Sequence, residues 1–143
     1  MPYAKINGIN LYYEDHGSGP VVMLTPGGRG DTNALRPLAA LLAPHLRVIL
    51  HDRRNCGRSE VAIGGELSEQ HHWAEEMAGL LKHIGASPAY ICGGSAGSRT
   101  SLTVAARHPE VAKGCYVWEV SGGPTSGAVM SPGYYGQYIE AAE

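Results

Sequence analysis

The chain has 143 residues, 43% of them hydrophobic and 17% charged, with a formal net charge of −2. This length is typical of one domain with a substantial core. The composition shows no basic excess, so neither nucleic acid nor an anionic membrane is expected as a partner. No apolar run reaches membrane-spanning length, and the N-terminus lacks the long apolar stretch of a signal peptide.

The cysteines indicate a reducing compartment. They are Cys56, Cys92 and Cys115, an odd number without clustered spacing. Cys92 and Cys115 lie in apolar, strand-like runs, so we expect both to be buried, reduced thiols. A cytoplasmic protein follows from this expectation.

The chain begins with a predicted hairpin. Two short alternating runs, 4–6 and 9–15, are joined by an Asn-Gly pair that is typical of a type I′ turn. The continuous apolar run 21–24 predicts a central strand that is covered on both faces. A helix is expected from about Asn33, with leucines on one face.

Strands and helices then alternate along the chain. The run 47–51 predicts a buried strand, and apolar residues at helical spacing predict a helix from Ser68. The apolar run 89–92 precedes the helical pattern 100–107, and 114–119 predicts a further strand. Such alternation is typical of βαβ units, so we predict an α/β fold with a mostly parallel sheet and helices on both faces.

The stretch 93–97 (Gly-Gly-Ser-Ala-Gly) lies between a predicted strand and a predicted helix. A serine flanked by glycines at such a turn is typical of a nucleophile elbow, in which small neighbours leave room for a strained backbone. The helix that follows offers free N–H groups to a developing oxyanion. On this motif alone, a Gly/Ser connection in another kind of βα unit is the alternative.

A second glycine-rich loop, 25–30 (Thr-Pro-Gly-Gly-Arg-Gly), follows the strand predicted at 21–24. It raises the alternative of a dinucleotide-binding fold. The G-x-G-x-x-G spacing is absent and no acidic residue is placed to hold a ribose, so this alternative is disfavoured.

Four motifs, in the family's order within residues 9–119, resemble the N-terminal half of an α/β-hydrolase. The loop 26–30 (PGGRG) resembles the family's H-G-G-P-G oxyanion loop, and 52–59 (DRRNCGRS) resembles its D-x-R-G-x-G-x-S loop. The elbow 93–97 is the third motif, and 107–111 (RHPEV) resembles the segment before the sixth strand. The resemblance implies the α/β-hydrolase fold, incomplete without its C-terminal strands.

Three residues depart from the family's pattern. Pro26 stands where the family usually has His, and Arg29 stands where it often has Pro. These two residues predict an oxyanion loop of unusual shape or polarity. Asn55 replaces a glycine, which is a mild change because Asn also tolerates the left-handed backbone.

The resemblance divides the chain into two parts. Residues 1–120 would form the N-terminal part of the hydrolase core, and residues 121–143 would begin a lid. In the second part, Tyr134, Tyr135 and Tyr138 would either line an apolar substrate pocket or pack the lid itself.

The resemblance also assigns roles to four residues. Ser95 would be the nucleophile, which is weak until a base takes its proton. The amides of Gly28 and Ala96 would form the oxyanion hole. Glu119 would close the last predicted strand and orient the catalytic histidine, because Trp118-Glu119-Val120 resembles the segment that carries the catalytic Glu of the zearalenone lactonases. The alternative for Glu119 is a strand-end carboxylate in solvent.

No histidine of the chain is placed as the catalytic base, so the base would come from outside it. We expect surface or capping roles for all seven, although His51 ends a strand at the functional edge of the sheet. His71 and His72 lack the i, i+4 spacing of a metal pair, so we expect no metal and no cofactor. The seven are His16, His45, His51, His71, His72, His83 and His108.

The family's sheet has a seventh strand beside the sixth, so a chain that stops at Glu143 would leave an open strand edge. We expect the C-terminal remainder of the same protein to pack there as a second chain after cleavage. A homo-oligomer is the alternative.

The resemblance implies a serine hydrolase that cleaves a mostly apolar carboxylic ester or lactone by acyl transfer. Two alternatives stay open: hydrolysis of a C–C bond in a diketone on the same fold, and a non-catalytic ligand-binding protein or fragment. The substrate is not identified, because the pocket and lid decide it rather than the fold.

Overall fold

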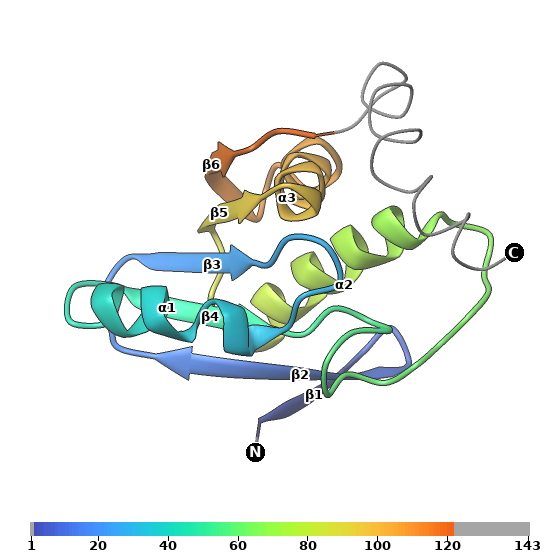
Figure 1. The fold of residues 1–143 in the computed structure, drawn as a ribbon, viewed down its shortest axis with the longest axis horizontal. Coiled ribbons are helices and arrows are strands. Elements are labelled where there is room, and N and C mark those ends of the chain that lie inside the picture. The colour runs from blue at the N-terminus through green and yellow to red at the C-terminus, as the bar shows by residue number, and fades with distance from the viewer. Residues whose placement is uncertain (1, 122–143) are drawn as a thin grey trace, which may run out of the picture.

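The computed structural model describes residues 2–121, which form a six-stranded sheet in the order β1-β2-β4-β3-β5-β6 (Figure 1). β4, β3, β5 and β6 run parallel to one another. β2 pairs antiparallel with both β1 and β4 at one side of the sheet. The strands are β1 (Tyr3–Ile6), β2 (Ile9–His16), β3 (Val21–Thr25), β4 (Arg47–His51), β5 (Ala89–Gly94) and β6 (Ala112–Trp118). The helices are the 3₁₀ turn η1 (Thr32–Ala34), α1 (Arg36–Leu42), α2 (Glu69–His83) and α3 (Ala96–Arg107).

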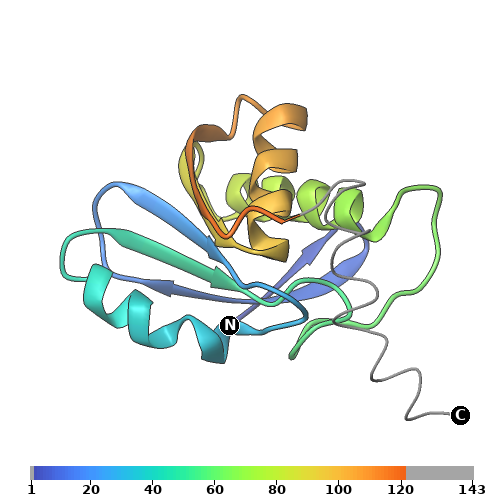
Figure 2. The same ribbon diagram turned by 45° about the horizontal axis from the view of Figure 1, so that its top comes forward.

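The predicted fold class is confirmed, because apolar side chains of the central strands alternate between two cores. Met23, Ile49 and Ile91 belong to one core, which also contains apolar residues of α2 and α3. Leu24 and Leu50 belong to the other, which contains residues of α1. Successive side chains of a strand point to opposite faces, so continuous apolar runs require helices on both sides. Figure 2 shows α1 on one side of the sheet and α2 and α3 on the other.

The N-terminal hairpin has the predicted turn. Asn7 and Gly8 both have positive φ, 49° and 86°, as a type I′ turn requires. β2 then continues past β1 and pairs with β4. The hairpin therefore extends the sheet on the side away from β5 and β6.

Two helices begin elsewhere than predicted. The helix expected from Asn33 begins at Arg36, because the Asp31 side chain accepts the Asn33 N–H and caps a separate 3₁₀ turn. α3 begins at Ala96, four residues before the predicted pattern, because the helix starts directly at the elbow. Its small and polar first turn gives no apolar periodicity. α2 begins as predicted, with the Ser68 side chain accepting the His71 N–H.

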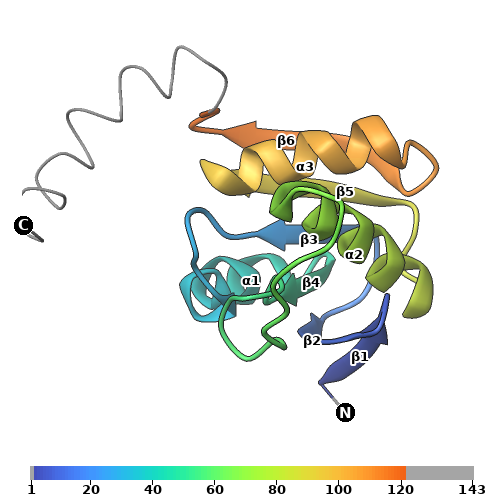
Figure 3. The ribbon, with the colours of Figure 1, turned by 90° about the vertical axis from the view of Figure 1, so that its right-hand side faces the viewer.

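β6 is the edge of the described sheet, and this corrects one prediction. Cys92 is buried as expected, but Cys115 on β6 is exposed. A strand with no neighbour beyond it leaves side chains uncovered, and Tyr116 and Trp118 are exposed as well. Figure 3 shows α3 alongside β5 and β6.

The predicted lid and its tyrosines lie outside the described residues, apart from Ser121. Within residues 2–121, no helix combines the length and the apolar character that crossing a bilayer requires.

Candidate active site

Four polar segments meet at one edge of the sheet. Residues 26–30 follow β3, residues 52–59 follow β4, the elbow follows β5 and Glu119 follows β6. The carboxyl ends of neighbouring parallel strands lie at the same edge, which is where ligands bind in open α/β sheets. The topology thus brings together all the residues to which the sequence assigns a role.

The elbow has the strained geometry that its sequence predicts. Ser95 has φ 53° and ψ −119°, a conformation that costs a residue with a side chain about 1–3 kcal/mol. A Cβ on Gly93 would lie 2.6 Å from the carbonyl of Gly97, and one on Gly97 would lie 2.4 Å from the carbonyl oxygen of Thr25. Only glycine fits at these two positions.

Residues 26–30, the predicted oxyanion loop, lie directly against the elbow. A Cβ on Gly27 would be 3.3 Å from the Cβ of Ser95. The loop turns sharply, since the Gly30 N–H donates to the Gly27 carbonyl at 2.9 Å and Gly28 has φ 48°. Within residues 2–121, neither the Gly28 amide nor the Ala96 amide donates a hydrogen bond to another residue. Their role as oxyanion donors stays a prediction.

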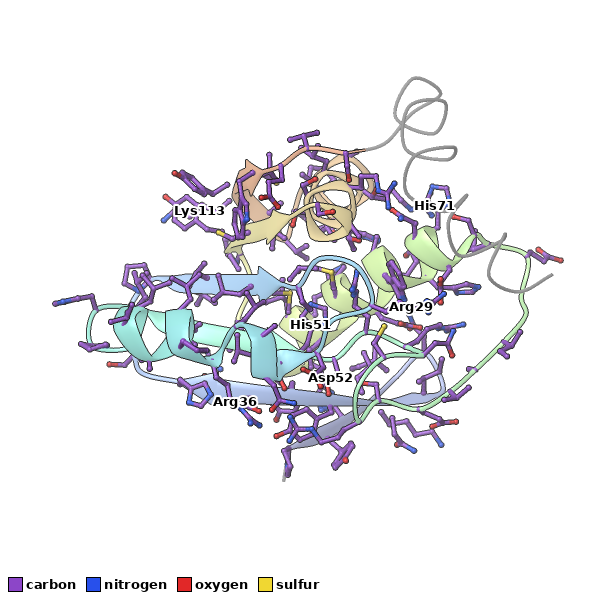
Figure 4. The ribbon with its side chains drawn as sticks, viewed as in Figure 1. Arg29, Arg36, His51, Asp52, His71 and Lys113 are labelled. Atoms are coloured by element: carbon purple, nitrogen blue, oxygen red, sulfur yellow. The ribbon has the colours of Figure 1, made fainter. Side chains whose placement is uncertain are left out.

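Two departures from the family's pattern converge on one carboxylate. The Arg29 guanidinium donates to both oxygens of Glu69, at 3.2 and 3.0 Å, and the Asn55 side chain donates to Glu69 at 3.1 Å. Burial alone would raise the pKa of Glu69, but the bonds from Asn55 and Arg29 hold it below its usual value. The ionised Glu69 ties the oxyanion loop and the loop after β4 to the start of α2. Figure 4 labels Arg29 at this edge.

A second carboxylate joins the loop after β4 to η1, which follows the loop 26–30. Asp52 is fully buried and accepts the Thr32 amide at 2.7 Å and the Arg58 amide at 2.8 Å (Figure 4). Hydrogen bonds from amides to a buried carboxylate are strong. The first residue of the D-x-R-G-x-G-x-S-like motif is thus structural here.

Sequence reasoning missed Arg53, whose side chain is buried beneath the oxyanion loop. Its Nη2 donates to the Gly28 carbonyl at 2.6 Å, and its guanidinium carbon lies 4.2 Å from the centre of the Trp73 ring. Burial lowers the pKa of Arg53. The resembled motif leaves this position unspecified, and an arginine is ordinarily assigned to the surface.

Glu119 lies next to the elbow but is uncommitted within the described chain. β6 ends at Trp118, one residue before the predicted end, and the Trp118 carbonyl accepts the Ser95 amide at 3.2 Å. Glu119 follows with φ 50°, and its exposed side chain makes no hydrogen bond within residues 2–121. Its role as the acid stays a prediction.

His51 is not at the surface, contrary to the prediction. Its ring is buried, and Nε2 lies 3.3 Å from the Thr25 hydroxyl (Figure 4). Burial and the nearby Arg53 charge lower its pKa to about 3, so the ring is neutral. All seven histidines lie in the described residues, and none is hydrogen-bonded there to the Ser95 hydroxyl. In the same residues, no group of three His, Cys, Asp or Glu side chains converges in a way that would hold a metal ion.

Residues 20–123 match the model of the alpha/beta hydrolase fold family. The chain therefore belongs to this family, as its four motifs predict.

Two relatives with similar sequences support the assignment to this family. The chain is 37% identical over 108 residues to YraK, an uncharacterised hydrolase of Bacillus subtilis, covering 74% of this chain and 39% of YraK. It is 30% identical over 108 residues to the 2-(acetamidomethylene)succinate hydrolase of Mesorhizobium japonicum, covering 76% of this chain and 38% of that protein. The chain thus spans about two fifths of the length of these relatives.

Solved structures agree. The E-2-(acetamidomethylene)succinate hydrolase superposes with a TM-score of 0.73 at 27% identity, covering 79% of this chain and 41% of that one. The enol-lactonase of Burkholderia xenovorans superposes with a TM-score of 0.76 at 27% identity, covering 99% of this chain and 57% of that one.

The buried His51 predicts a measurable dependence of stability on pH. Its pKa of about 3 in the folded state lies below the unfolded value of about 6.5, so the unfolded chain binds the extra proton between these values. The stabilisation is complete above pH 6.5 and is lost as the pH falls towards 3. Between pH 7 and pH 5, wild type should lose about 2 kcal/mol more than His51→Gln, measured by urea unfolding. Equal losses in the two proteins would contradict this.

Proposed function

We propose that the protein is a serine hydrolase that cleaves a mostly apolar carboxylic ester or lactone by nucleophilic acyl transfer. The observation that carries this proposal is the contact between the strained Ser95 elbow and Gly27, which precedes Gly28 in the loop 26–30. It sets a hydroxyl-bearing residue beside two amides without partners in the described chain, those of Gly28 and Ala96. These are the parts that acyl transfer requires.

The reaction would proceed in two halves. The Ser95 hydroxyl gives its proton to a base and attacks the substrate carbonyl, while the Gly28 and Ala96 amides bind the resulting oxyanion. The intermediate collapses, the alcohol leaves with the transferred proton, and an acyl-serine ester is formed. Water then attacks this ester by the same route, releases the acid and restores Ser95.

The base would be a histidine outside this chain, and Glu119 would orient it. The state of His51 supports this view, because burial makes its ring a weak base and its Nε2 lies against the Thr25 hydroxyl rather than that of Ser95. The bond from Ser95 to the carbonyl of Trp118 supports the position of Glu119, because it places the next residue beside the elbow. A carboxylate there can hold the histidine in the correct tautomer and stabilise its charged form.

The family relatives support hydrolysis and, in one case, a lactone. The name of the superposed enol-lactonase states that it acts on a lactone. The name of the 2-(acetamidomethylene)succinate hydrolase states that it is a hydrolase. The three cysteines are unpaired, which supports the proposed cytoplasmic location because disulfides are rare there.

We further propose that the remainder of the same protein packs over β6. A groove of about 490 Å³ lies between α1 and the sheet, and its walls include Leu24, Leu42, Tyr90, Tyr116 and Trp118. An apolar face of this kind calls for a covering partner. The matched relatives are more than twice as long as the stretch that they share with this chain, so a further segment of the same protein is the occupant that we favour.

Labelling by a fluorophosphonate tests the nucleophile. In the full-length protein, Ser95 should be labelled, and Ser95→Ala should abolish both labelling and hydrolysis of 4-nitrophenyl butyrate, by about 10⁴-fold or more in kcat. Ser101→Ala is the control, because Ser101 is a serine near the elbow that is fully buried and whose hydroxyl donates to a helical carbonyl, that of Gly97. A full-length protein whose Ser95 stays unlabelled would favour the ligand-binding alternative.

The acid assignment predicts that Glu119→Gln lowers kcat by about 10²–10⁴-fold, because a neutral amide no longer stabilises the protonated histidine. Steady-state kinetics with circular dichroism as the folding check would measure this. Glu110→Gln is the control, since Glu110 is an exposed carboxylate paired with Lys82. Unchanged turnover in Glu119→Gln would refute the assignment.

Coverage of β6 predicts that the Cys115 thiol is protected in the purified natural protein. Iodoacetamide should modify Cys115 at least tenfold more slowly before urea is added than after it, with mass spectrometry as the readout. Modification at the rate of a free thiol would contradict coverage.

A further inference from the structure

Burying the charged side chain of Arg53 costs free energy of folding, so a contribution to stability does not explain why an arginine stands at this position. Its side chain is 1% exposed, and its Nε and Nη1 atoms have no hydrogen-bond partner within residues 2–121. No described carboxylate forms an ion pair with it, although neighbouring Arg54 pairs with the buried Glu76. Both oxygens of nearby Glu69 are used by other residues. A buried cation without a paired anion destabilises a fold.

The Arg53 side chain makes one hydrogen bond, to the loop 26–30, and one stacking contact, with Trp73 of α2. Nη2 donates to the Gly28 carbonyl at 2.6 Å, which is short even for a charge-assisted bond. The guanidinium stacks on Trp73 at 4.2 Å, and the Trp73 Nε1–H donates to the Arg54 carbonyl at 3.2 Å. The cation is therefore held between a fixed indole ring and the loop.

Two hydrogen bonds, one of them from Arg53, fix the peptide units before and after Gly28. A peptide unit is planar and trans, so its C=O and N–H point in opposite directions. The Gly27 carbonyl accepts the Gly30 N–H, which directs the Gly28 N–H away from that bond. The Arg53 bond fixes the next peptide unit, between Gly28 and Arg29. A glycine at φ 48° would otherwise rotate easily between conformations.

We propose that Arg53 is a positioning residue that holds the Gly28 turn ready to bind the oxyanion. This inference rests on the proposed function, because it deepens the role of the same site. Oxyanion binding is effective when its donors are already oriented, so that they need not reorganise during the reaction. The fold thus accepts a destabilising buried charge in return for an ordered loop, a common exchange at active sites.

Two substitutions in the full-length protein test the proposal. Arg53→Met keeps the volume and removes the donor and the charge, whereas Arg53→Lys keeps the charge but offers a single point donor. We expect kcat per phosphonate-titrated site for a 4-nitrophenyl ester to fall about tenfold in Arg53→Met and less in Arg53→Lys, with KM within about twofold. The melting temperature of Arg53→Met should equal or exceed that of wild type.

A structural role for Arg53 predicts the opposite pattern. In that case Arg53→Met would melt at a lower temperature while kcat per titrated site changed by less than about twofold, and this result would overturn the proposal. Arg107→Met is the control for charge removal, because Arg107 is partly exposed at the far end of α3 and pairs with Glu75. It should leave kcat unchanged.

Nuclear magnetic resonance separates this inference from the proposed function. If wild type is neither labelled nor active, the proposed function fails, but the amide signal of Gly28 still reports on the loop. In ¹⁵N-glycine-labelled protein, Arg53→Lys should change the chemical shift of the Gly28 amide. The chemical shift of Gly85 should not change; this glycine also has a positive φ but follows α2, so it serves as the control. A Gly28 signal that stays in place would overturn the positioning role whatever the catalytic result.

Discussion

The backbone of the elbow packs on the backbone of the oxyanion loop, and the rest of the site depends on this contact. Two chain segments approach this closely only where no side chain stands between them, which is why Gly97 lies against Thr25. The contact joins the ends of β3 and β5, which are already neighbours in the sheet. Sheet pairing therefore brings the segments together, and the absence of a Cβ sets their final separation. The strain at Ser95 is sustained because both sides of the turn are packed.

Charged groups hold the loops that surround this contact. The loops lie beyond the carboxyl ends of the strands, where neither apolar core reaches them. Asp52 and Glu69 bind them through amides and guanidinium groups, from inside and from the start of α2 respectively. Hydrogen bonds to charged groups in a partly buried setting are strong and directional, so they can fix loops that have little apolar surface. Arg53 is the exception in this set, since it has no balancing anion in the described chain.

Much of this arrangement can be predicted from local sequence, and the remainder depends on contacts between distant residues. The strand at 47–51 is predicted at its true bounds because an apolar run covered on both faces is unambiguous. The elbow is predicted from its glycines, and the role of the loop 26–30 is predicted only from its resemblance to the family's motif. Convergence of Arg29 and Asn55 on Glu69 is not predictable, because the partners are 40 and 14 residues apart. The burial of His51 and Arg53 and the exposure of Cys115 are also missed, because residue type alone predicts the reverse.

The strand order has a consequence for how the site is built during synthesis. β1 to β4 precede β5 in the chain, and N-terminal segments fold first during synthesis, so β5 joins the free side of β3 after β3 and β4 are able to pair. The oxyanion loop and the loop after β4 are thus complete before Ser95 exists. The strained serine therefore packs against segments that are synthesised before it, so the partners that sustain its strain do not have to be awaited.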